Sequence, residues 1–79
     1  MTALHPTTEM AMNEVVFLVE DAAEGGLTAR ALGHSIHTEA DTFGELRLQV
    51  RDAVQRHFDE GARPAVIRLH YVKDEVLAA

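Results

Sequence analysis

The pattern of apolar and polar residues begins with a segment that predicts a central strand. From Glu14 the run EVVFLVED is rich in β-branched and aromatic residues and is too short for a helix, so we expect a strand that is apolar on both faces and central in its sheet. Gly25 and Gly26 then predict a hairpin loop. The next segment, LTARALG, alternates, with Leu27, Ala29 and Ala31 on one face and Thr28 and Arg30 on the opposite, solvated face.

Two further segments alternate in the same way. Gly33 ends the second strand, and SIHTE predicts a short third strand with Ile36 and Thr38 on one face and Ser35, His37 and Glu39 on the other. AVIRLHYV predicts a fourth strand, with Ile67, Leu69 and Tyr71 on one face and Val66, Arg68, His70 and Val72 on the other. The segment KDEVLAA that follows is expected to extend this strand or to form a short helical turn.

A period of 3.6 residues predicts one helix between the third and fourth strands. Thr42 and Glu45 have the spacing of a capping box, which satisfies backbone N–H groups of the first turn. Gly61 is placed to be the residue just past the end and Pro64 forbids continuation, so we expect the helix to end near Glu60. The apolar stripe consists of Phe43, Leu46, Val50, Ala53, Val54 and Phe58, and the solvated side carries Arg47, Arg51, Asp52, Gln55 and Arg56.

The element order β-β-β-α-β predicts a two-layer α+β domain. Tight loops favour an antiparallel meander of the first three strands, and a right-handed crossover through the helix returns the fourth strand parallel to the first. The expected mixed sheet has the strand order 3-2-1-4, with one helix on one face and with the third and fourth strands at the edges. Residues 1–11 lack periodicity and include Pro6, so we expect a poorly ordered tail followed by a single domain, residues 12–79.

Composition adds expectations about partners and compartment. A 79-residue domain without cysteine has a small core and no disulfides, so we expect self-association, as a dimer or tetramer, in a reducing, cytoplasmic compartment. The longest apolar run is far shorter than the roughly 20 residues that cross a bilayer, so no membrane association is expected. The formal charge of −6 disfavours nucleic acid and suits a basic protein partner.

The densest group of chemically active side chains is HSIHTEAD, residues 34–41. On a strand, the odd spacing places His34 and His37 on opposite faces, so they cannot chelate one ion together. His37 and Glu39 do share a face, and His70 is the candidate for a third ligand. Without the spacing of a known site we expect no specific metal, although a small metal-dependent hydrolase that uses these three residues is an alternative.

Carboxylates gather where the helix begins. Glu39, Asp41 and Glu45 are explained by the positive end of the helix dipole, and a thin two-layer domain has little volume for the water-excluding pocket that acid–base catalysis needs. We therefore expect no catalytic residue and no cofactor. His57, near the other end of the helix, is expected to be a partly buried histidine favoured by the dipole.

The solvated face of the predicted sheet supplies the candidates for partner binding, namely Arg30, His37, Glu39, Arg68 and His70. Solvation or a homo-oligomer interface is the ordinary explanation for such a face. An RNA-binding module is an alternative, but Tyr71 points to the other face and no aromatic platform for stacking bases accompanies the arginines.

Residues 12–58, MNEVVFLVEDAAEGGLTARALGHSIHTEADTFGELRLQVRDAVQRHF, resemble the N-terminal domain of HicB-like antitoxins. The shared features are a hydrophobic first strand, an acidic glycine-containing hairpin, a second strand leading to a G-x-S segment, and EADTFGEL opening the helix; the likeness extends to residue 72. The resemblance implies a truncated RNase H-like fold and a non-enzymatic domain that binds a small basic HicA-type RNase toxin. HicB-like repressors carry a separate DNA-binding domain, and because only KDEVLAA follows the fourth strand, direct DNA binding is not expected.

Overall fold

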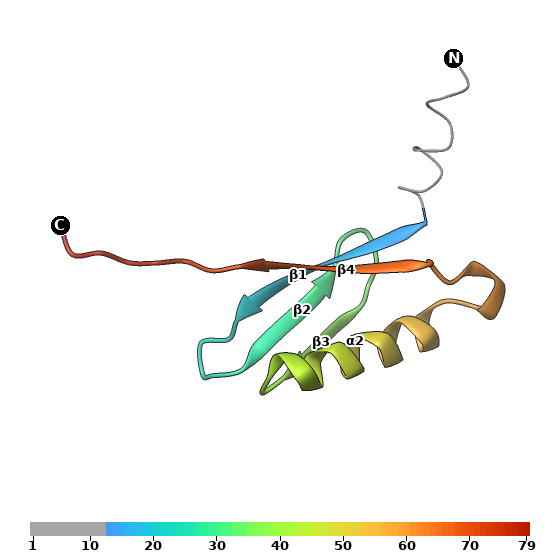
Figure 1. Cartoon of the computed structure of the whole chain (residues 1–79), viewed down its shortest axis with the longest axis horizontal. Coiled ribbons are helices and arrows are strands. Elements are labelled where there is room, and N and C mark those ends of the chain that lie inside the picture. Colours follow the sequence, from blue (N-terminus) through green and yellow to red (C-terminus); the bar gives the residue numbers. More distant parts are fainter. Residues whose placement is uncertain (1–12) are drawn as a thin grey trace, which may run out of the picture.

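The computed structural model describes residues 13–79 and contains a four-stranded mixed sheet with one α-helix on one face (Figure 1). The elements are β1 (Glu14–Asp21), β2 (Leu27–Ala31), β3 (His37–Ala40), α2 (Phe43–His57), the 3₁₀ turn η1 (Glu60–Ala62) and β4 (Val66–Val72). The strand order is β3-β2-β1-β4, with β1 antiparallel to β2 and parallel to β4. The predicted α+β fold, strand order and central position of β1 are therefore confirmed. The predicted tail at residues 1–11 lies outside the described residues.

The hydrophobic core fills the space between α2 and one face of the sheet. The helix lies chiefly across β3 and β2 and leaves β4 at the margin of the layer. The largest fully buried side chains are Phe17 and Val19 of β1 and Leu46 and Val50 of α2. The predicted apolar stripe of the helix is confirmed, since each of its members is buried or packs against the buried cluster. Within residues 13–79, no helix has the length and apolar character needed to cross a bilayer.

A glycine hairpin joins β1 to β2, as predicted. The N–H of Ala22 donates to the Gly26 carbonyl at 3.0 Å, and the N–H of Gly25 donates to the Ala22 carbonyl at 3.1 Å. Gly25 and Gly26 have φ angles of 102° and 81°, a region that side chains disfavour. The loop thus needs glycine at both positions.

The third strand is displaced from its predicted position. The prediction placed it at SIHTE, whereas β3 consists of His37–Ala40. The N–H of Ala31 donates to the Ile36 carbonyl at 2.9 Å, and Gly33 has a φ of 85°, so residues 32–35 form the turn. Ile36 is 6% exposed and packs into the core just before the strand begins.

The helix begins as predicted and ends earlier. Thr42 Oγ1 accepts from the N–H of Glu45 at 3.2 Å, which is the expected N-cap. The helix ends at His57 because Phe58 is extended (φ −101°, ψ 140°), which turns its ring against the core. The prediction of an end near Glu60 is wrong, and Gly61 lies in η1 without the positive φ of a C′ residue.

The segment after β4 adopts neither predicted form. The strand ends at Val72, and residues 73–79 have no regular secondary structure and are exposed throughout. In Figure 1 this segment continues from β4 and leaves the rest of the domain. We call residues 73–79 the arm.

Candidate functional site

The face of the sheet opposite α2 is not covered by any other element of residues 13–79. Strand pairing assigns to it the alternate residues Glu14, Val16, Leu18, Glu20, Thr28, Arg30, His37, Glu39, Val66, Arg68, His70 and Val72. We call this set the open sheet face. It includes all five residues predicted to bind a partner, namely Arg30, His37, Glu39, Arg68 and His70. The second apolar face predicted for β1 is here, with Val16 and Leu18 half-buried.

The register across the sheet separates the histidines of the candidate metal site. His37 lies opposite Arg30, Arg30 opposite Leu18, and Leu18 opposite His70. Three strand spacings, about 14 Å, therefore separate His37 from His70. Within residues 13–79, no three His, Cys, Asp or Glu residues lie close enough together to hold a metal ion. His70 is thus not placed to complete a site with His37 and Glu39.

The two arginines of the open sheet face lie on opposite sides of β1. Arg68 Nε donates to Glu14 Oε2 at 2.6 Å, and the side chain of Arg68 is 62% exposed. Arg30 sits on β2 between Leu18 and His37. Because apolar and acidic residues separate the two guanidinium groups, the face does not offer the continuous basic stripe that a nucleic acid backbone requires.

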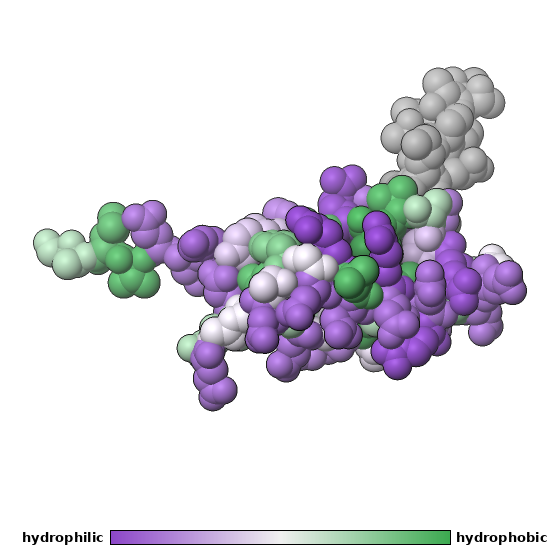
Figure 2. Space-filling view, turned by 60° about the horizontal axis from the view of Figure 1, so that its bottom comes forward, coloured by the Kyte–Doolittle hydropathy of each residue, from purple (hydrophilic) through white to green (hydrophobic). Residues whose placement is uncertain are grey.

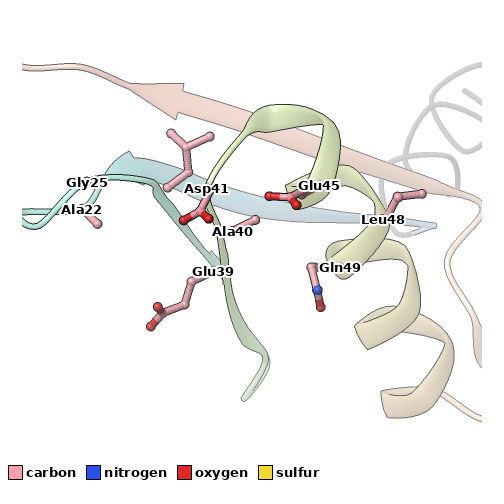
Figure 3. Close-up of a pocket in the computed structure, with 9 residues that line it drawn as sticks. Ala22, Gly25, Glu39, Ala40, Asp41, Glu45, Leu48 and Gln49 are labelled. Atoms are coloured by element: carbon pink, nitrogen blue, oxygen red, sulfur yellow. The ribbon is translucent and has the colours of Figure 1, made fainter.

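A hollow lies at the junction of β3 and α2, and we call it the acidic hollow (Figure 3). Its volume is about 510 Å³, and its lining consists of Ala22, Gly25, Leu27, Glu39, Ala40, Asp41, Glu45, Leu48 and Gln49. Figure 3 shows Glu45, from the first helical turn, pointing toward Asp41, while Glu39 extends outward from β3. The three carboxylates are exposed, so the hollow admits water and is not the water-excluding pocket that acid–base catalysis needs.

The two remaining histidines of interest lie against Phe58 near the end of α2. The rings of His34 and Phe58 are edge to face with centroids 4.9 Å apart, and those of His57 and Phe58 have the same separation. His57 is exposed, which corrects the prediction of partial burial. The reason is that Phe58, the next residue, turns inward instead and leaves His57 at the surface.

A hydrogen bond that the sequence did not suggest links the ends of β1 and β4. The Tyr71 hydroxyl donates to Asp21 Oδ1 at 2.7 Å. The hydrogen bond, partial burial and the negative charge of Asp21 all raise the pKa of the Tyr71 phenol above its usual value. The two residues are 50 positions apart, and only the parallel pairing of β1 with β4 brings them together.

Tyr71 is the only tyrosine in a chain without tryptophan, so its ionisation can be followed alone by absorbance at 295 nm. We expect its pKa to lie above the ordinary value of about 10, and we expect Asp21→Ala to lower it toward that value. A raised folded-state pKa stabilises the fold below the unfolded pKa and ceases to do so as the pH rises through the folded pKa. Identical titration curves for the two proteins would contradict the bond, and Glu24→Ala in the same hairpin is the control.

Comparison with known proteins identifies two relatives. A UPF0150 protein of Archaeoglobus fulgidus is 58% identical over 50 residues, which cover 63% of this chain and 74% of the relative. A UPF0150 protein of Thermotoga maritima is 40% identical over 65 residues, which cover 82% of this chain and 91% of the relative. No protein-family model matches the chain, and no solved structure matches it.

Proposed function

Since the chain belongs to the UPF0150 family, we propose that it acts as a HicB-like interaction domain, performs no catalysis and binds a small basic HicA-type RNase toxin. Two observations support the proposal. The β-β-β-α-β order with one helix agrees with the fold that the HicB resemblance of residues 12–72 implies. The formal charge of −6 favours encounter with a basic protein.

The observation that carries the proposal is the acidic hollow. Its carboxylates come from β3 (Glu39), from the residue that follows β3 (Asp41) and from the first turn of α2 (Glu45). Asp41 and Glu45 border a volume of about 510 Å³, large enough to receive lysine or arginine side chains, and Glu39 extends outward at its margin. A basic protein is therefore the class of partner that the hollow suits best.

The wall of the hollow also offers an apolar contact. Leu48 is 65% exposed and lies beside the carboxylates in the lining. Protein interfaces commonly combine an apolar anchor with a polar rim, and contacts at the centre supply most of the affinity. We propose that the toxin packs on Leu48 while its basic side chains bond the surrounding carboxylates.

A binding experiment with the HicA-type protein of the same genome tests this proposal. We expect the tagged chain to retain that protein, and retention to weaken with added salt because salt screens exposed charges. The double variant Glu39→Arg/Glu45→Arg should weaken binding at least tenfold, about 1.4 kcal/mol, when measured by calorimetry. The same variant should fail to suppress the RNase activity of the HicA-type protein.

The control is Asp59→Arg/Glu60→Arg, which makes the same change in charge at the start of η1, beyond the opposite end of α2. We expect it to bind as the unaltered chain does. If the unaltered chain fails to retain the HicA-type protein at low salt, the antitoxin function is wrong. If Asp59→Arg/Glu60→Arg weakens binding as much as Glu39→Arg/Glu45→Arg, net charge and not the acidic hollow governs recognition.

A further inference from the structure

β4 is an edge strand, and the arm that continues from it pairs with no other strand of residues 13–79. The outer edge of β4 faces no other strand of residues 13–79. Figure 1 shows the arm running on in nearly the direction of β4, and Figure 2 shows its hydrophobic end standing clear of a largely hydrophilic surface. Val76 and Leu77 are 93% and 78% exposed. Because an exposed edge and an extended segment both present unpaired backbone groups, they favour pairing with another strand.

We propose that two copies of this chain pair through β4 and the arm, with residues 66–76 of each antiparallel to the same residues of the other about a twofold axis at Tyr71. The pairing would supply about ten backbone hydrogen bonds and join two four-stranded sheets into one. α2 lies over β3 and β2, so it does not obstruct the outer edge of β4.

The side chains of this segment are self-complementary in that register. Residues opposite each other in a continuous antiparallel sheet share a face, and the even-numbered residues of β4 lie on the open sheet face. Continued along the arm, this alternation places Val66 opposite the partner's Val76, Arg68 opposite the partner's Asp74, and His70 opposite the partner's Val72. The twofold axis makes each match twice, so the interface has two ion pairs flanked by two valine pairs.

The charges around Asp74 favour a cation from outside the chain. Asp74 lines a hollow of about 340 Å³ together with Glu20, Asp21 and Val72, so the surroundings of Asp74 are negatively charged. Arg68 uses Nε to bond Glu14, and a guanidinium has further donors for a second carboxylate. The partner's Arg68 would therefore reduce the repulsion at Asp74.

The side chains of the two copies are also complementary on the face of the sheet that carries α2. A groove of about 280 Å³ runs between α2 and β4, lined by Arg47, Val50, Arg51, Ile67 and Leu69. In the proposed register the partner's Glu75 lies opposite Ile67, on the side of the sheet where Arg47 and Arg51 border the groove. The partner's Leu77 lies opposite Ala65, next along the same edge, and would lose its exposure there.

Neighbouring registers that keep the faces matched are less complementary on the open sheet face. An axis at His70 places Asp74 opposite the partner's Val66 and Arg68 opposite the partner's Val72. An axis at Val72 places Arg68 opposite the partner's Val76. Both leave a charge against an apolar side chain, a mismatch that opposes pairing.

Charge reversal tests the interface, with molar mass from light scattering as the measurement. We expect the chain of 8.7 kDa to show twice that mass, and Asp74→Arg or Arg68→Asp to weaken the dimer at least tenfold because like charges then oppose each other. The double variant Arg68→Asp/Asp74→Arg should restore the dimer. A monomer at chain concentrations up to about 500 μM, above any micromolar Kd, overturns the proposal. So does a dimer that neither single variant weakens.

Engineered cysteines test the register, since the chain has none of its own. Val66→Cys/Val76→Cys should form a covalent dimer on mild oxidation, because opposite residues have Cβ atoms close enough for a disulfide. Either single variant should stay reduced, since the ten-residue offset holds the identical thiols about 33 Å apart. Efficient cross-linking of a single variant, or none of the double variant while it remains a dimer, overturns the register.

The dimer proposal and the toxin-binding proposal are tested by different experiments, so one can be wrong while the other holds. Mass and cross-linking are measured on the chain alone, whereas toxin binding is measured with Glu39→Arg/Glu45→Arg, whose substitutions lie on β3 and α2 and not on β4. We expect that double variant to remain a dimer and Asp74→Arg to retain the HicA-type protein.

Discussion

Phe17→Ala is expected to lower the free energy of unfolding by about 3–5 kcal/mol, the largest effect of any single truncation in this domain. Phe17 is fully buried on the central strand, where it faces α2, so its removal leaves a cavity lined by apolar groups. A domain of this length has a total stability of roughly 4–12 kcal/mol. The variant therefore loses a large part of its stability or unfolds at room temperature. Urea denaturation followed by circular dichroism at 222 nm measures the change.

Leu18→Ala is the matched control for Phe17→Ala. Leu18 is the next residue of β1, but it lies half-buried on the open sheet face, so its truncation leaves no enclosed cavity. We expect a cost of about 1 kcal/mol. Both variants are compared at one chain concentration, since dimer formation adds stability by mass action. Equal losses of unfolding free energy in the two variants would contradict a core that lies only on the face of the sheet that α2 covers.

Gly26→Ala is expected to destabilise the domain by about 3 kcal/mol, the second large effect. A Cβ added at Gly26 would lie 2.8 Å from the Ala40 carbonyl oxygen, which belongs to the backbone at the end of β3 and cannot rotate away. The positive φ of 81° adds strain for any side chain. The same urea titration reports the loss.

Gly25→Ala separates the two causes. Gly25 also has a positive φ, 102°, but a Cβ there would meet nothing within 4 Å. Its substitution therefore measures backbone strain alone, at about 1 kcal/mol. If Gly25→Ala and Gly26→Ala lose equal free energy of unfolding, the contact of a Cβ at position 26 with the Ala40 carbonyl oxygen does not contribute.

Strand order and side-chain faces could be predicted because local patterns determine them. The two-sided apolar run of β1 requires a central position, and short loops allow only a meander of β1, β2 and β3. With period-two alternation, the sequence also placed Arg30 and His37 on the face opposite Ala29, as the register confirms.

Boundaries that depend on tertiary packing could not be predicted. The helical period continues through Phe58, but the backbone of Phe58 is extended and its ring packs against the core, so α2 ends one residue earlier. The sequence does not show the contact of Phe58 with the core, so it predicted that the helix continues to about Glu60, just before Gly61. Likewise, Ile36 fits the alternation of a strand but packs into the core before the strand hydrogen bonds of His37 begin.

The candidate sites also combine features that the sequence predicts with features that only the fold reveals. Glu39, Asp41 and Glu45 were found as a group because they are close in sequence, but the hollow between them also needs Leu48 and Ala22, which come from other turns of the chain. The proposed pairing of Arg68 with the partner's Asp74 could be inferred only from the position of β4 at the edge of the sheet and from the exposure of the arm within residues 13–79.

The parallel pairing of β1 with β4 also has a consequence for the time course of folding. Glu14 lies opposite Val66, so this ladder closes a loop of more than half the chain, whereas the β1–β2 and β2–β3 ladders close short hairpins. Long loops cost more chain entropy, and such contacts form late and slow the overall rate. During synthesis at the ribosome, the edge of β1 that pairs with β4 therefore stays unpaired until almost the whole domain has emerged. Until then, this apolar strand is prone to associate with other chains.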